Sequence, residues 1–310
     1  MSQPLKYLTV LWIALMAGVA SFSVYNQPIS VEELVSRFDV TTSLVIFALI
    51  MLGKLSMVVQ VHLTLKAAGE GRGFLFSWMA YSLADVGKYL PGGIWGIAGR
   101  LGIYKQANIP IKLGARLVLI ETFLIIFYSS AIGLAILLWT GMLDFGTTKR
   151  IVLAFACLLA PFVLTFTFFI RLGIGTVVWT FLILSLTWLA FGVSFALVAG
   201  KDLCCEIEMA GIFNIGFAAG QLAVFAPSGI GVREWVISIL SHPYEGAATR
   251  LIIELALGHR FIWMIADFGM LLLIGLIRFP TNFSGKVAGA YFNQGKVNKR
   301  EHHSPIDDSE

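Results

Sequence analysis

Long runs of apolar residues, separated by short polar stretches, dominate the chain. Six of the runs are long enough to cross a bilayer as a helix, which takes about 20 residues. They cover about residues 6–25, 42–66, 114–140, 151–170, 176–199 and 251–277. Segments that alternate polar and apolar positions, as a transmembrane barrel requires, are absent from the sequence. The pattern predicts an all-helical protein that crosses the membrane several times.

Two further apolar segments, at about 73–105 and 209–240, are interrupted near their middles. The first interruption reads KYLPGGIWGIAGR and the second reads FAPSGIGVREW. Proline removes a backbone donor and glycine adopts angles that other residues avoid, so each interruption ends one helix and starts another. The residues predicted to make these breaks are Pro91, Gly92, Gly93, Pro227, Ser228, Gly229 and Gly231. Each segment is either a re-entrant pair of helices or two complete spans, and the sequence leaves both open.

The two halves of the chain, about 1–140 and 151–278, follow the same order of spans and broken segment. Each half has an odd number of full spans, so the second half is predicted to be inverted relative to the first. Inverted repeats with discontinuous helices are a common plan in transporters. The local match between the two breaks is short, and chance similarity between glycine-rich turns is the alternative. We expect a single transmembrane domain over 1–280 and a polar, partly disordered cytoplasmic tail over 281–310.

Composition and charge agree with a membrane protein. Of the 310 residues, 58% are hydrophobic, and the mean hydropathy is +0.84; a soluble domain is rarely more than half apolar. The net charge is +4, and the basic residues gather in loops on one side of the predicted spans. By the positive-inside rule this distribution predicts that both termini are cytoplasmic. No clustered basic face is present, so a nucleic-acid partner is not expected.

Several charged residues lie within the apolar segments, where a charge is costly and normally faces the protein interior in a pair. Glu121 and Arg260 are the clearest cases, and Lys54 is another. Arg260 and Asp267 are seven residues apart and therefore share one helix face.

Phosphate is the ligand that these features favour. A helix that starts after a glycine break points free N–H groups at a ligand, and arginine binds phosphate through two parallel hydrogen bonds. The candidate phosphate-binding residues are Lys88, Arg100, Arg233 and Arg260, and the acids expected in the same cavity are Asp85, Glu121, Glu234 and Glu254. Structural ion pairing is the alternative role for these charges.

No arrangement of residues indicates catalysis. The sequence has no nucleophile elbow, no metal-binding His-Glu-x-x-His motif and no phosphate-binding loop of a nucleotide-driven pump. We therefore predict no catalytic residue, no metal and no cofactor.

At its two breaks the chain resembles the lysylphosphatidylglycerol synthase transmembrane-region family, the membrane domain of bacterial aminoacyl-lipid synthases, which also occurs as stand-alone proteins. The resemblance extends over about 6–280. The first family motif is matched by Lys88, Pro91, Gly92 and Arg100. The second is matched by Pro227, Gly229, Gly231, Arg233 and Glu234, with Ser228 in place of a glycine. The resemblance implies a stand-alone, flippase-like protein of the bacterial cytoplasmic (inner) membrane, without the soluble synthase domain.

The expected function is therefore that of a transporter rather than an enzyme. It would translocate a phosphate-containing lipid, or a headgroup linked to polyprenyl phosphate, for envelope and glycan biogenesis. Its partners would be a membrane lipid or lipid-linked saccharide and, by the resemblance, glycosyltransferases or other envelope-assembly proteins. One alternative is a membrane glycosyl- or phospho-transferase using a lipid-linked donor, with Glu32 and Glu33 as the leading acids. Another is a non-catalytic subunit of a glycan assembly complex.

Overall fold

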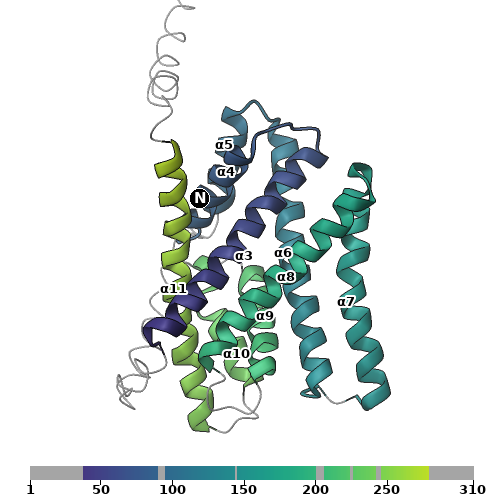
Figure 1. The fold of residues 1–310 in the computed structure, drawn as a ribbon, viewed down its shortest axis with the longest axis vertical. Helices are drawn as coiled ribbons and strands as arrows, with labels where there is room; N and C mark the ends of the chain where they lie inside the picture. The colour runs from purple at the N-terminus through teal and green to yellow at the C-terminus, as the bar shows by residue number, and fades with distance from the viewer. Residues whose placement is uncertain are drawn as a thin grey trace, which may run out of the picture. The chain divides into compact units, whose positions relative to one another are not determined.

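The computed structural model describes residues 38–89, 95–143, 145–199, 206–223, 226–241 and 246–278. Within these ranges every regular element is helical, with nine α-helices and two short 3-10 turns (Figure 1). The predicted all-helical class is thereby confirmed. The predicted first span at about 6–25, the acids Glu32 and Glu33, and the tail at 281–310 lie outside the described residues.

Five of these helices are long and apolar enough to cross a membrane. They are α3 (Val40–Ala67), α6 (Ile111–Thr140), α7 (Thr147–Phe169), α8 (Ile174–Ala199) and α11 (Gly246–Arg278). Each matches a predicted span to within a few residues at either end, because the apolar run itself sets the length of the helix. They support a multi-pass membrane protein.

Local sequence signals fix several of the helix ends. The carboxylate of Asp39 accepts a hydrogen bond from the backbone N–H of Thr42 at 3.0 Å and so caps the start of α3. Helix α6 ends at Gly141, which adopts the left-handed conformation. The 3-10 turn η1 (Ile170–Leu172) continues α7 and also ends at a glycine, Gly173.

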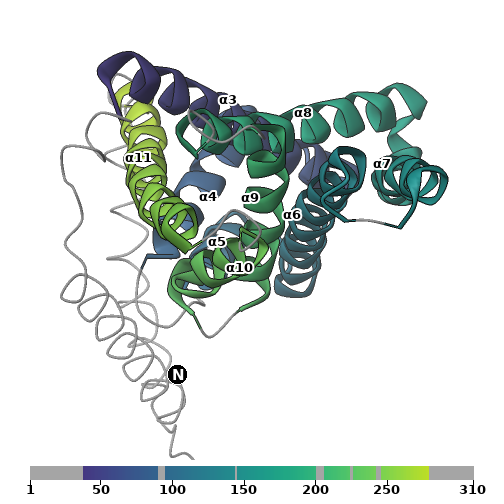
Figure 2. The same cartoon turned by 90° about the horizontal axis from the view of Figure 1, so that it is seen from below.

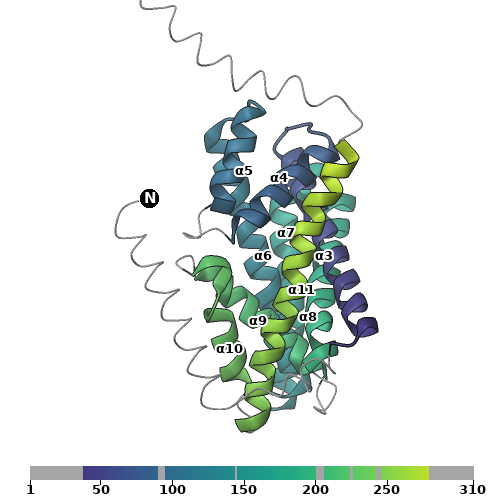
Figure 3. The same cartoon turned by 90° about the vertical axis from the view of Figure 1, so that its left-hand side faces the viewer.

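The two broken segments form two pairs of short helices. The first pair is α4 (Phe74–Gly87) and α5 (Trp95–Gln106), and the second is α9 (Glu206–Leu222) and α10 (Val232–Leu240). The members of each pair pack against each other. At 14 residues, α4 is about 21 Å long, shorter than the roughly 30 Å hydrocarbon core of a bilayer. The pairs occupy opposite ends of the long helices (Figure 3).

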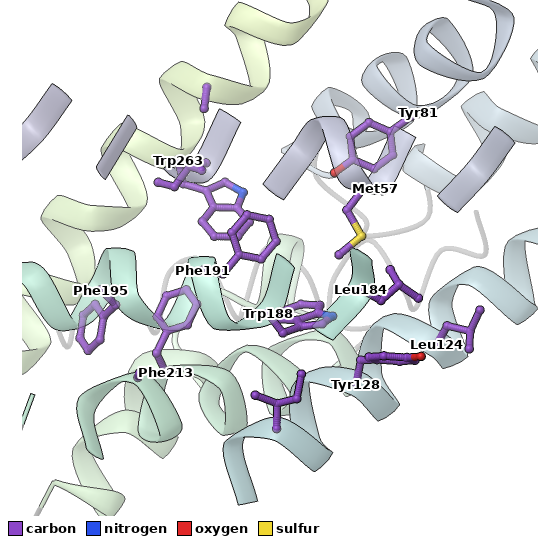
Figure 4. Close-up of a cluster of buried hydrophobic side chains, with 14 of the residues drawn as sticks. Met57, Tyr81, Leu124, Tyr128, Leu184, Trp188, Phe191, Phe195, Phe213 and Trp263 are labelled. Atoms are coloured by element: carbon purple, nitrogen blue, oxygen red, sulfur yellow. The ribbon is translucent and has the colours of Figure 1, made fainter. Parts of the chain in front are cut away.

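Helix α8 lies among the long helices and packs on α3, α6, α7 and α9 (Figures 1 and 2). An aromatic cluster fills the space between α8, α9 and α11 (Figure 4). There the rings of Phe191 and Trp263 lie 4.4 Å apart, centroid to centroid. Close packing of the helices depends on small residues: a Cβ added to Gly53 of α3 would lie 2.2 Å from the Phe191 ring.

This close approach predicts that Gly53→Ala destabilises the protein. The added methyl group must displace the buried Phe191 ring, and such overpacking costs about 1–3 kcal/mol. The measurement is the thermal unfolding midpoint of the protein in detergent. Gly102→Ala is the matched control, because nothing lies within 4 Å of a Cβ at that helical position. Equal midpoints for the two variants would contradict the packing of α3 on α8.

Candidate functional site

The second break is a tight turn that needs residues tolerant of positive φ. Ser228, Gly229 and Gly231 have φ values of 54°, 66° and 85°, a region that glycine enters without strain. Gly229 also packs on α9, since a Cβ there would lie 2.7 Å from the Gly220 backbone. The backbone N–H of Gly231 donates to Glu234 Oε2 at 2.8 Å, which caps the start of α10. The predicted break is thus present, and Pro227 opens its 3-10 turn, η2 (Pro227–Gly229).

The first break falls between α4 and α5. Its central residues, Pro91, Gly92 and Gly93, lie outside the described residues. Lys88 forms the C-cap of α4, and Arg100 lies in the second turn of α5. The two basic residues therefore flank the break on different helices.

Lys88 belongs to a buried cluster of two lysines and two aspartates. Its Nζ lies 2.7 Å from Asp85 Oδ1 and 2.9 Å from Asp267 Oδ2. Lys54 Nζ lies 2.9 Å from Asp85 Oδ2 and also pairs with Asp267. Each lysine contacts both carboxylates, so the charges balance within the cluster. We call these residues the α3–α4–α11 tetrad.

Two aromatic side chains complete the surroundings of the tetrad. The Tyr89 hydroxyl donates to Asp267 Oδ2 at 2.5 Å, and Lys54 Nζ lies 4.7 Å from the centre of the Trp263 ring, within the range of a cation–π contact. Sequence reasoning identified Lys54 and Asp267 as intramembrane charges but missed Tyr89 and Trp263. Aromatic residues are common in such chains, and no local signal separated these two from the rest.

Two further ion pairs join the short helices to their long neighbours. Arg100 of α5 pairs with Glu121 of α6, which is 1% exposed. Arg100 Nε and Glu121 Oε1 have no hydrogen-bond partner among the described atoms. On the other side, Arg260 of α11 pairs with Glu234 of α10 at 2.7 Å and also donates to the backbone oxygen of Ser228. The second pair therefore ties α11 to the turn of the second break.

Arg233 differs from the other basic residues of the site. It is 6% exposed, and its guanidinium carbon lies 4.2 Å from the centre of the Phe213 ring, with Phe217 and Trp263 within 5.7 Å. Its Nε and Nη2 have no hydrogen-bond partner among the described atoms, and no described carboxylate forms an ion pair with it. A buried charge without a partner is costly, and the ring contacts offset only part of that cost.

Among the described charges of the site, the cations therefore outnumber the carboxylates by one. Five are cations and four are carboxylates: Lys54, Lys88, Arg100, Arg233 and Arg260 against Asp85, Asp267, Glu121 and Glu234. Every member except Arg233 pairs with an opposite charge. The arrangement can accept one anionic group beside Arg233.

A cavity of about 220 Å³ lies between the two pairs of short helices. Residues of the first pair and residues of the second line the same space. Its polar and break residues are Lys54, Tyr81, Asp85, Lys88, Gly96, Arg100, Glu121, Thr122, Gly220, Gln221, Ser228 and Gly229. A smaller cavity of about 20 Å³, enough for about one water molecule, shares several of these residues and adds Tyr89, Arg233 and Arg260. Residues that flank the first break and residues of the second thus line two polar spaces that share part of their lining.

The structure brings together most of the residues singled out from the sequence. Lys88, Arg100, Asp85 and Glu121 line the larger cavity. Arg233 and Arg260 line the smaller one, and Glu234 holds Arg260 without lining either. Glu254 is half-buried on α11 and lines neither cavity.

Among the described residues, no group of three or more metal-ligating side chains is arranged to hold a metal ion. A comparison with models of protein families finds no match, and no curated protein matches the sequence of the chain. The resemblance carried by the two break motifs therefore stays a prediction.

The tetrad predicts a measurable coupling between α3 and α11. Asp267→Asn should lower stability on the order of 3 kcal/mol, because it leaves the buried Lys54 and the half-buried Lys88 with one carboxylate. Lys54→Met combined with Asp267→Asn should recover part of this loss, since it removes the surplus charge. Thermal unfolding in detergent compares Asp267→Asn, Lys54→Met and the double variant with the wild type.

The control for this cycle is Glu70→Gln, which breaks a surface pair with an N–O distance of 3.7 Å to Arg72. An exposed pair contributes at most about 1 kcal/mol. Strictly additive effects of the Lys54 and Asp267 substitutions would show that the two side chains do not interact.

Proposed function

We propose that the chain is a membrane lipid translocator that moves a phosphate-containing headgroup through the cavity between its two broken segments. The observation that carries the proposal is Arg233, a buried guanidinium whose Nε and Nη2 have no hydrogen-bond partner among the described atoms. It lines the small polar space that shares lining residues with the larger cavity between the two segments. An arginine in this state is suited to a phosphate, which accepts hydrogen bonds and neutralises the charge.

The proposed topology has six full spans, the first at about 6–25, and two re-entrant pairs, α4–α5 and α9–α10. The short helices support re-entry, since 14 residues in α4 and nine in α10 do not cross a bilayer. Non-helical backbone at membrane depth is tolerated beside protein or water, as at the Ser228–Gly231 turn. The opposite placement of the two pairs supports an inverted repeat (Figure 3). In the proposed topology both termini are cytoplasmic and the membrane is a bacterial inner membrane.

The size of the cavity supports a headgroup, rather than a whole lipid, as its occupant. At about 220 Å³ it is smaller than the pockets of roughly 300–1,000 Å³ that enclose drug-sized ligands. In the proposed mechanism the headgroup enters the cavity while the acyl chains stay in the surrounding bilayer. A phosphate beside Arg233 would make the charges of the site equal in number, which lowers the cost of holding it at membrane depth.

The ion pairs that line the cavity could each bind the phosphate of the headgroup in turn. Arg100 and Glu121 line the cavity, and among the described atoms Arg100 Nε and Glu121 Oε1 are buried without a hydrogen-bond partner. Lys88 is shared between two carboxylates. In our proposal a phosphate exchanges for these carboxylates in turn as it moves from one pair of short helices to the other. The resemblance of the break motifs to the lysylphosphatidylglycerol synthase membrane region supports the same substrate class. The proposed partners are lipid-linked saccharides and envelope-assembly enzymes.

The decisive variant is Arg233→Met. Methionine keeps an apolar stem against Phe213 and removes an unpaired charge, so we expect stability that equals or exceeds that of the wild type. Translocation of an acyl-labelled phosphatidylglycerol should nevertheless slow by about tenfold or more, the range for losing a charged hydrogen bond. The measurement is loss of label accessibility to an external quencher in reconstituted vesicles.

Two controls accompany this assay. Lys149→Gln removes one exposed charge at the start of α7 and should leave the rate unchanged. A galactosyl diacylglycerol with the same chains and label lacks phosphate and should translocate slowly in every variant. Full-rate phosphatidylglycerol movement by Arg233→Met would rule out the assigned role, and a large loss of stability would mark Arg233 as structural instead.

A further inference from the structure

A second cavity, of about 380 Å³, lies apart from the central one, among α3, α6 and the end of α7. It is lined by Thr64, Ala67, Ala68, Leu113, Arg116, Leu117, Ile120, Thr167, Phe168, Phe169 and Arg171. It shares no lining residue with the cavities beside Arg233. Its walls are the last turn of α3, the first turns of α6 and the turn η1 after α7. All three are ends of long apolar helices, the depth at which lipid headgroups meet a membrane protein.

The polar groups of this cavity favour an anion. Arg116 and Arg171 line it from different helices, both side chains are exposed, and no residue in its lining is acidic. The hydroxyls of Thr64 and Thr167 already donate to backbone oxygens within their own helices, at 2.9 and 2.7 Å. No described residue forms a hydrogen bond or ion pair with either guanidinium group, and a guanidinium matches the geometry of a phosphate.

The remaining walls are apolar and continue into exposed apolar surface. Ile120 and Phe168 are among the lining residues. Phe123 lies two turns below Arg116 on the same face of α6 and is 48% exposed. Val163 lies one turn below Thr167 on α7 and is 54% exposed. A ligand held by the arginines would thus have an apolar path along α6 and α7 for its chains.

We propose that this cavity is a resident site for an anionic phospholipid, with the phosphate between Arg116 and Arg171 and the acyl chains along α6 and α7. Basic pockets between transmembrane helices are known to bind anionic headgroups. The site requires that these helices span the membrane, but it is independent of the translocation that we propose for the central cavity. Such a lipid would hold α7, which packs mainly on α6 and α8, against the end of α3.

The test counts lipids retained by the purified protein in native mass spectrometry. Palmitoyl-oleoyl phosphatidylglycerol is titrated against phosphatidylcholine of the same chains. The measurements are repeated in the Arg233→Met background, so that binding in the central cavity does not contribute. We expect one tightly retained phosphatidylglycerol and weaker phosphatidylcholine binding. Arg116→Gln with Arg171→Gln should weaken phosphatidylglycerol binding by about tenfold or more.

The matched control is Lys105→Gln with Lys112→Gln. It removes the same charge from exposed positions at the end of α5 and the start of α6, outside the cavity. This variant should bind phosphatidylglycerol as the wild type does. If both double variants lost phosphatidylglycerol binding equally, the binding would come from general attraction to the basic surface, and the proposed site would be wrong. Equal retention of the two lipids, or glycerol 1-phosphate binding as tightly as the intact lipid, would also overturn it.

Discussion

The pairing of buried charges between helices is the constraint on which the rest of this structure depends. An ionised side chain cannot remain alone in an apolar interior at low cost. Lys54, Asp85, Lys88 and Asp267 satisfy one another only because α3, α4 and α11 meet at one place. The pairs Arg100–Glu121 and Arg260–Glu234 join α5 to α6 and α10 to α11 in the same way. Helices α4, α5 and α10 thus each carry a charge whose partner lies on a long helix.

Arg233 stands out because the other described charges around it are paired. If the site served stability alone, its charges would be equal in number or replaced by apolar side chains, which often stabilise as well or better. Instead, the guanidinium of Arg233 is buried among aromatic rings, and no carboxylate of the described residues pairs with it. Functional sites commonly keep groups that stability alone would remove. The surplus charge, more than the presence of many charges, is the feature on which we base the proposed binding site.

The central cavity and the cavity beside Arg116 and Arg171 differ in setting. The central one lies beside the breaks, where helix ends and paired charges surround a space of headgroup size. The one beside Arg116 and Arg171 lies at the ends of long helices and opens onto apolar surface. The first setting suits a group that crosses the membrane, and the second suits a lipid that remains in one leaflet. Both follow from the same chemistry, in which arginine recognises phosphate.

The sequence by itself determined the helices and the breaks. Apolar run length predicted α3, α6, α7, α8 and α11, because a span must match the thickness of the bilayer. Proline and glycine predicted the turn at Ser228–Gly231, because few other residues adopt its backbone angles. Charged residues within apolar runs indicated the site for a similar reason: their cost restricts them to the protein interior.

Only the tertiary structure decided which charges meet. Arg260 and Asp267 share one helix face in sequence, yet Arg260 pairs with Glu234 while Asp267 pairs with Lys54 and Lys88. The sequence grouped Arg233 with three other basic residues, and only the structure shows that it is the one of the four with no ion pair to a described carboxylate. Tyr89 and Trp263 gave no signal at all. The physical reason is that ion pairing depends on which helices are neighbours, and helix packing is set by side-chain fit over distances that no local pattern records.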